Sequence, residues 1–358
     1  MGLSRRITGL TGGGSDGWDV YYRAKEMKAR GLPVVQLTIG EHDIGTDRQI
    51  IDAMHGAMVA GHTGYSMFNG NANLREIIAA RVTEHTGLAT TPDNVLVVPG
   101  GQAGLFAAHH AACDEGDRAL FIDPYYATYP GTIRGVGAVP VAVAARPERG
   151  FQPDAAEIAA QAEGAKSLLI NTPNNPTGVA YTRETLEGIA GVAQAHDLWV
   201  ISDEVYDTQV WEGAHLSPRT LPGMAERTLV VGSLSKSHAM TGSRIGWVVG
   251  PEEAIAHMAN LSTHTTYGVA GFVQEAAVFA LGLGPEFEAE VAAPFRRRRD
   301  IVMDMLEGQN TIRPIPPDGT MFVMLDIRAT GLSGEAFAER LLDDYHVAVM
   351  PGESFGQA

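Results

Sequence analysis

Seven short runs of aliphatic and β-branched residues alternate with longer helix-like stretches between residues 95 and 250, and this alternation limits the fold more than any other feature. The runs are Val95–Val98, Arg118–Ile122, Val139–Ala144, Ser167–Ile170, Leu198–Ser202, Thr228–Val231 and Ile245–Val249. Such alternation is typical of a parallel sheet that helices cover on both faces. The last run follows the sixth through a connection too short for a helical crossover, so we expect it to be antiparallel. The sequence therefore predicts an α/β fold with a seven-stranded, mostly parallel sheet flanked by helices.

A smaller α+β domain is predicted to follow this sheet. Its signals, which come after a long helical stretch through Arg296 to Leu306, are a strand-like run at Met321–Asp326, a helix at Gly334–Tyr345 and a short strand at Val347–Met350. A chain of 358 residues is long enough for about two domains. We expect residues 1–45 to pack on the small domain, residues 46–293 to form the large domain, and residues 294–358 to form the small one.

The charge balance excludes several classes of partner. The chain has 26 Lys and Arg against 42 Asp and Glu, which gives a net charge of −16. This acidity disfavours nucleic acids and anionic membranes, because phosphate groups are bound by clustered basic residues. A single cysteine, Cys113, excludes an internal disulfide framework and a multi-cysteine metal site, and it suits a reducing compartment. No apolar run resembles a signal peptide or a membrane span, so we expect a cytoplasmic protein without metal, nucleic-acid or membrane partners.

Polar and aromatic residues follow most of the predicted strands, at the edge of the sheet where ligands bind in open α/β folds. The glycine turn after the first run opens a helix and offers backbone N–H groups to an anion, although such a turn alone is a weak signal. The candidate residues are Gly101 and Gln102 after the first run, Tyr126 after the second, Asn175 after the fourth, Asp203 and Tyr206 after the fifth, and Ser233, Ser235, Lys236 and Arg244 after the sixth.

These residue types together match the needs of one cofactor, pyridoxal phosphate. A lysine amine forms a Schiff base with its aldehyde, and a carboxylate keeps its pyridine nitrogen protonated so that the ring accepts electrons. Asparagine and tyrosine can hydrogen-bond the phenolic oxygen of the ring. Serines and an arginine can hold the phosphate by charge-assisted hydrogen bonds.

Three segments strongly resemble the class I/II, aspartate-aminotransferase-like enzymes of pyridoxal phosphate fold type I. These segments are Asn175–Gly178 (NPTG), Ser202–Tyr206 (SDEVY) and Ser233–Trp247 (SLSKSHAMTGSRIGW). Within this family the stretches Leu198–Tyr206, Ser233–Gly250 and Met321–Leu332 are similar to arginine–pyruvate transaminases. The resemblance implies an aminotransferase that moves an amino group from an L-amino acid to a 2-oxo acid, here from a cationic donor to pyruvate.

The resemblance also implies a role for each candidate. Lys236 is the Schiff-base lysine and general acid/base, Asp203 the partner of the ring nitrogen, and Asn175 and Tyr206 the contacts of the phenolic oxygen. Tyr126 is the aromatic residue that stacks on the ring, and Gly101, Gln102, Ser233, Ser235 and Arg244 form the phosphate site. Gly40 and Asn175 contact the substrate. Tyr65, in the stretch Tyr65–Arg75, would reach the phosphate of a neighbouring subunit, which implies a homodimer with shared active sites.

One departure and two alternatives remain. The family continues past the segment that Val349–Gly356 resembles to an arginine for the substrate α-carboxylate, whereas this chain stops at Ala358. We therefore expect the small domain to be truncated. No residue of this sequence is assigned the role of that arginine. The same cofactor residues would serve a β-lyase or another Cα-directed enzyme, or a non-catalytic cofactor-binding module. A guanidinium donor would need a carboxylate near its tail, for which Asp16, Asp19 and Glu41 are candidates.

Overall fold

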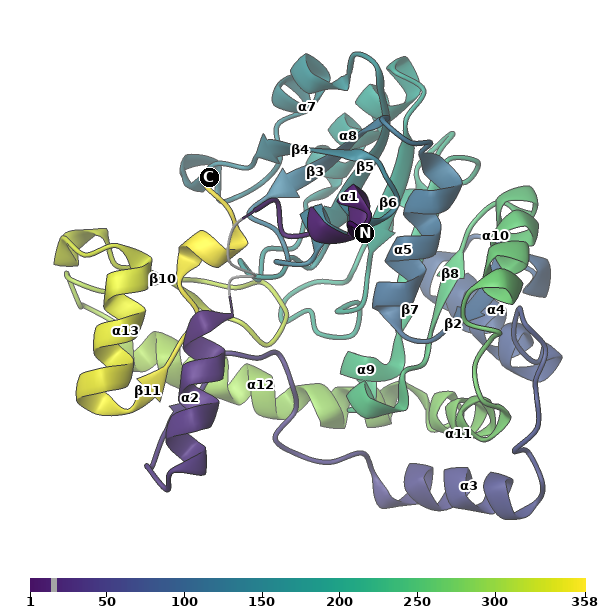
Figure 1. Cartoon of the computed structure of the whole chain (residues 1–358), viewed down its shortest axis with the longest axis horizontal. Coiled ribbons are helices and arrows are strands. Elements are labelled where there is room, and N and C mark those ends of the chain that lie inside the picture. Colours follow the sequence, from purple (N-terminus) through teal and green to yellow (C-terminus); the bar gives the residue numbers. More distant parts are fainter. Residues whose placement is uncertain (14–17) are drawn as a thin grey trace.

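A computed structural model covers the whole chain and describes residues 1–13 and 18–358 (Figure 1). Its central sheet has seven strands in the order β2-β8-β7-β6-β5-β3-β4. The strands are β2 (Val95–Val98), β3 (Arg118–Asp123), β4 (Val139–Ala144), β5 (Ala165–Asn171), β6 (Trp199–Asp203), β7 (Thr228–Ser233) and β8 (Gly246–Val249). β8 is antiparallel to both of its neighbours, and the remaining pairs are parallel. The predicted α/β architecture and the reversed last strand are confirmed.

The side chains of each strand alternate between two buried faces, as the two-residue period of a strand requires. On one face, Phe121, Ile201 and Val231 pack against helices α5 (Gly101–Ala112), α6 (Tyr129–Gly135) and α10 (Glu252–His264). On the other face, the β3–β6 half packs against α7 (Ala155–Ala162) and α8 (Arg183–Ala195). The β2–β8–β7 half of that face packs against α3 (Arg48–Val59), α4 (Ala72–Thr86) and α11 (Gly271–Leu281). Both faces are apolar, which explains why the strands are continuous apolar runs in the sequence.

The amino-terminal segment joins the carboxyl-terminal elements at one end of the molecule (Figure 1). Strand β1 (Val35–Gln36) pairs in parallel with β11 (Val347–Ala348), and α2 (Asp19–Ala29) packs on α13 (Gly334–Tyr345). The small helix α1 (Arg5–Thr8) lies instead against α6, where Arg134 Nη1 donates to the carbonyl of Leu10 at 3.0 Å. The division of the chain at residues 45/46 and 293/294 stays a prediction.

Helix α12 (Gly284–Leu306) connects the two ends of the molecule and is longer than expected (Figure 1). The sequence places a helical stretch through Arg296 to Leu306, but the helix begins at Gly284 and continues through Pro294. Strand β10 (Met324–Asp326) is shorter than the expected Met321–Asp326, and it pairs with β9 (Arg313–Ile315). The one-turn helix α9 (Leu234–Ser237) follows β7. Short 3₁₀ helices lie at Pro92–Asn94, Pro147–Arg149, Pro218–Thr220, Thr241–Ser243, Arg328–Thr330 and Gly352–Phe355.

The described part of the chain offers neither a membrane-spanning helix nor a metal-binding cluster. None of their helices is both long and apolar enough to cross a membrane. Within the same part of the chain, no group of three or more His, Cys, Asp or Glu side chains could hold a metal ion.

Candidate active site

Lys236 lies at the carboxyl edge of the sheet because β7 ends in the single turn of α9. Ser233 caps this turn, and its Oγ accepts the backbone N–H of Ser235 at 3.1 Å. The Lys236 Nζ atom donates a hydrogen bond to the carbonyl of Gly40, far away in the sequence. Burial lowers the pKa of the Lys236 amine to about 8, although the carboxylate of Glu41 acts in the opposite direction. The amine is therefore partly unprotonated near neutral pH.

Asp203 is the last residue of β6, and its carboxylate is buried. The Tyr129 hydroxyl donates to Asp203 Oδ2 at 2.8 Å, and the backbone N–H of Val205 donates to Oδ1 at 3.3 Å. Burial raises the pKa of Asp203 to about 6, and these two hydrogen bonds limit the rise. The sequence analysis missed Tyr129, although it follows Tyr126 by about one helical turn, a spacing that could have suggested it.

Tyr206 and Asn175 are brought next to Lys236. The Lys236 Nζ atom lies 5.9 Å from the centre of the Tyr206 ring. Burial raises the pKa of the Tyr206 phenol, and a hydrogen bond with the Asn175 side chain lowers it in part. Asn171 fixes the loop of Asn175, since its Oδ1 accepts the Asn175 N–H at 2.6 Å and its Nδ2 donates to the Asp203 carbonyl at 2.9 Å. The ends of β5 and β6 are therefore tied together at the site.

A set of donors lies where β2 and β7 end and β8 begins. Gly100 has a φ of +84°, and a Cβ at this position would collide with the guanidinium of Arg244. Helix α5 begins at Gly101 without a side-chain cap, so its first N–H groups are available to an anion. Ser233 Oγ donates to Ser235 Oγ at 2.9 Å, and a Cβ at Gly101 would lie 3.9 Å from Ser233 Cβ. The glycine turn, the two serines and Arg244 therefore converge.

Two further candidates lie beside this set. The Tyr126 ring is 5.8 Å from the Tyr129 ring in an edge-to-face arrangement, which places it beside the partner of Asp203. The side chain of Gln102 is occupied, because its Nε2 donates to Thr132 Oγ1 at 2.6 Å and its Oε1 accepts from Thr128 Oγ1 at 3.1 Å. In this conformation the backbone N–H of Gln102 is still available to an anion.

Gly40 and Tyr65 have contrasting positions. A Cβ at Gly40 would lie 2.6 Å from the Phe322 ring, so this close approach requires glycine. The Phe322 ring in turn packs edge-on against Tyr206, at 5.7 Å between centres. Tyr65 is 90% exposed and contacts the ring of Tyr267 at 5.1 Å. The structure does not bring Tyr65 to the other candidates of its own chain.

The three carboxylates considered for a cationic donor differ in their placement. Asp16 lies outside the described residues. Asp19 begins α2 and lines a cavity of about 1070 Å³ that extends to Gln102. Glu41 is exposed, accepts a hydrogen bond from Thr241 Oγ1 at 2.9 Å, and acts electrostatically on Lys236.

The donor set fits pyridoxal phosphate. Among residues 1–13 and 18–358, no cation directly contacts the buried carboxylate of Asp203, and its anionic form would be stabilised by a protonated ring nitrogen. The glycine turn and the guanidinium of Arg244 suit a phosphate. The Lys236 amine, with a pKa of about 8, suits an aldehyde. The assignment of each residue to one cofactor atom stays a prediction.

Comparison with known proteins agrees with this chemistry. Residues 33–357 match the family model described as aminotransferase class I and II. The chain is 43% identical over 349 residues to arginine–pyruvate transaminase AruH of Pseudomonas aeruginosa, covering 97% of this chain and 88% of that protein. It is 36% identical over 359 residues to aspartate/prephenate aminotransferase of Thermus thermophilus, covering 99% and 91%. The solved structure of Thermus thermophilus aspartate aminotransferase with maleate superposes with a TM-score of 0.93 at 35% identity, covering 99% and 92%.

Proposed function

This chain belongs to the class I and II aminotransferases, and from this membership we propose that it moves the amino group of a cationic L-amino acid, such as arginine, to pyruvate. Amino-group transfer with pyridoxal phosphate follows from the family itself and from the named relatives. The choice of substrates is supported by one observation, the likeness to arginine–pyruvate transaminase over nearly the whole chain.

Pyridoxal phosphate supplies an aldehyde that bonds to amines and a ring that accepts the electrons of a breaking Cα–H bond. Lys236 would hold the cofactor covalently, and its Nζ atom would act as the base that takes the Cα proton of the amino donor. A pKa of about 8 suits this role, because a general base works best when its pKa is near the working pH. The carbonyl of Gly40 orients Nζ by accepting its hydrogen bond.

The remaining residues are proposed to bind and orient the ring and its phosphate. Asp203 holds a proton on the ring nitrogen, while Tyr129 orients the carboxylate through the hydrogen bond at 2.8 Å. Asn175 and Tyr206 hydrogen-bond the phenolic oxygen. Tyr126 stacks on the ring. The phosphate is bound by Arg244, by the hydroxyls of Ser233 and Ser235, and by the backbone N–H groups of Gly101 and Gln102.

Glu41 is the proposed partner of the cationic tail of the donor. It follows Gly40 directly, its carboxylate is exposed, and its negative charge acts on Lys236. A carboxylate beside the reacting lysine attracts a guanidinium or ammonium group and repels an acidic side chain.

A panel of amino donors tests the proposal. Arginine, lysine, alanine, aspartate and glutamate are offered in turn, and the visible absorbance of the bound cofactor is followed for all five. With pyruvate as acceptor, the formation of alanine is followed for the four donors other than alanine. We expect the highest kcat/KM for arginine. Glu41→Gln should raise KM for arginine several-fold, as expected for a partly exposed ion pair, and leave KM for alanine nearly unchanged. A preference for aspartate or glutamate would contradict the proposed donor class.

We also propose a cytoplasmic homodimer. The exposed pair of Tyr65 and Tyr267, together with apolar residues on and after α3 that include Met58, Val59 and Met67, supports an interface between two copies. Tyr65 would then complete the phosphate site of the partner. The single cysteine, buried at the end of α5, supports a reducing compartment.

A further inference from the structure

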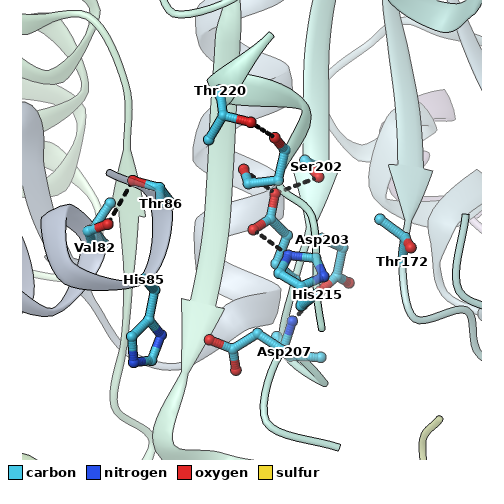
Figure 2. Close-up of polar contacts among 12 residues, drawn as sticks. Val82, His85, Thr86, Thr172, Ser202, Asp203, Asp207, His215 and Thr220 are labelled. Atoms are coloured by element: carbon cyan, nitrogen blue, oxygen red, sulfur yellow. Dashed lines mark hydrogen bonds and ion pairs between the residues drawn. The ribbon is translucent and has the colours of Figure 1, made fainter. Parts of the chain in front are cut away.

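Glu204, the neighbour of Asp203, belongs to a buried ion pair on the other side of the β6 edge. Consecutive residues of an extended chain point to opposite sides, so Asp203 faces Tyr129 while Glu204 faces away from it. Three side chains donate to the Glu204 carboxylate, each at 2.8 Å: the hydroxyls of Ser202 and Ser217 on Oε1 and the ring Nε2 of His215 on Oε2 (Figure 2). These contacts are outside the proposed cofactor site.

The hydrogen bonds make His215 the ionisable partner of the Glu204 carboxylate. An ionised carboxylate accepts hydrogen bonds on both oxygens, and polar partners lie at both oxygens of Glu204. The side chains of Glu204 and His215 are only 8% and 14% exposed, and a buried carboxylate needs a cationic partner. Although burial opposes it, the charge of Glu204, the hydrogen bond and the charge of Asp207 raise the pKa of His215.

Several ionisable groups surround the pair of Glu204 and His215. The nearby ionisable groups are Arg81 and His85 on α4, Asp207 after β6, Arg219 in the helix Pro218–Thr220, Glu288 on α12 and His238 after α9. Arg81 pairs with Asp207 at 3.3 Å and with Glu288 at 2.9 Å. Burial lowers the pKa of His85 and, to about 4, that of His238, so both rings are neutral. Asp203, next to Glu204, and Glu226, which acts on Arg219, add further negative charge. Carboxylates therefore outnumber the two arginines, and a protonated His215 offsets part of this excess.

Glu204 also acts on Asp203. Its negative charge is one of the causes that raise the pKa of the Asp203 carboxyl, after burial itself. A Glu204 anion that lost its partner would repel the Asp203 anion more strongly across the same stretch of backbone.

We propose that the pair of Glu204 and His215 is a positioning device for the reaction: the charge of His215 neutralises Glu204, so that Asp203 keeps the negative charge on which the cofactor ring depends. The proposal rests on the role assigned to Asp203. His215 touches neither substrate nor cofactor in this scheme and acts through its neighbours.

The test measures cofactor binding rather than activity. The apoprotein is titrated between about pH 5.5 and 8.5 with 4′-deoxypyridoxine 5′-phosphate, which keeps the ring and the phosphate but lacks the aldehyde, so that Lys236 forms no bond. The variants are His215→Gln, Glu204→Gln and the double variant, and His257→Gln on the exposed face of α10 is the control. Glutamine at 215 can still donate to Glu204 but carries no charge.

Affinity for the ligand should fall below a certain pH. In His215→Gln we expect this pH to be higher by about one unit, which is the size of a nearby charge effect at intermediate dielectric constant. The double variant should return this pH to the wild-type value, because it removes the uncompensated anion. If His215→Gln does not fold, the double variant should fold and bind like the wild type. A double variant no better than the single one, or an unshifted single variant, would overturn the proposal.

Asp203→Asn separates this proposal from the assignment of Asp203 itself. If Asp203 is the partner of the ring nitrogen, this variant should bind more weakly at high pH and lose the pH dependence that the other variants shift. Unchanged binding and pH dependence in Asp203→Asn would show that Asp203 has another role. Asp203→Asn could lose the pH dependence while His215→Gln behaves like the wild type. This result would support the role of Asp203 and refute the role of His215.

Discussion

Removal of a single hydroxyl, in Tyr129→Phe, should make cofactor binding strongly dependent on pH. The Tyr129 hydroxyl donates to the buried carboxylate of Asp203 at 2.8 Å. Hydrogen bonds to charged groups are worth about 1.5–3 kcal/mol, and one pKa unit corresponds to about 1.4 kcal/mol, so the pKa of Asp203 should rise by roughly one to two units. From its present value of about 6, it would reach roughly 7 to 8.

The ionised fraction of Asp203 sets the size of the effect. At pH 7 this fraction would fall from about nine-tenths to between about one-tenth and one-half, so cofactor affinity should drop about two- to tenfold. The direction follows from the charge: only the ionised carboxylate pairs with a protonated ring nitrogen, so the loss should grow below pH 7 and vanish near pH 9. Equilibrium titration of the apoprotein with pyridoxal phosphate at several pH values measures this dependence.

Tyr181→Phe is the matched control, because Tyr181 is also buried but packs in the apolar cluster on the opposite face of the sheet. It should bind the cofactor like the wild type at every pH. An equal loss of affinity at all pH values in Tyr129→Phe would show that the hydroxyl supports the fold rather than the charge of Asp203. No loss at pH 6 would refute the reasoning altogether.

Three further predictions concern the cofactor and the assembly. Lys236→Ala should reduce turnover about 10²–10⁴-fold through the lost proton transfer. Borohydride reduction of the wild type followed by peptide mapping should label Lys236, and a label on another lysine would contradict the assignment. Arg244→Ala should weaken pyridoxal phosphate binding by about 1.5–3 kcal/mol, or roughly 10–150-fold, whereas an unchanged dissociation constant would mean that its guanidinium faces elsewhere when the cofactor binds. When Tyr65→Phe and Lys236→Ala are mixed under conditions that exchange subunits, hybrid dimers should form that have one intact site and are more active than either variant alone. If hybrids are verified by mass but activity does not recover, Tyr65 is excluded from the partner's site.

The strands could be predicted well because burial on both faces leaves a clear pattern in the sequence. Val139–Ala144 and Val95–Val98 have the expected bounds, and the others differ by only a few residues at their ends. Helix α12 could not be predicted from local rules, since Pro294 normally ends a helix but here lies inside it. The start of β10 was misplaced because Thr320 adopts a φ of +67°, and Phe322 turns toward Gly40. Neither feature is visible in residue preferences.

The candidate site was predictable to the extent that strand ends bring residues together. Lys236 and Asn175 follow strands and Asp203 ends one, so the topology alone places them at one edge. Contacts between segments that are distant in the sequence leave no such pattern in the order of residues. Tyr129 reaches Asp203 across 74 positions, and Gly40 reaches Lys236 across 196. His215 lies in a loop without strand or helix periodicity, so its bond to Glu204 is visible only in three dimensions.

The parallel pairing of β1 with β11 has a consequence for the order of events during synthesis. Val35 pairs with Val347, so 347 − 35 = 312 residues must be added before the partner of β1 exists. At about 5–20 residues per second, this takes roughly 15 to 60 s. All seven strands of the central sheet, which end at Val249, leave the ribosome earlier. We therefore expect Lys236 to be open to its cofactor on the nascent chain, and the segment with Gly40 to close over it only once β11 has emerged.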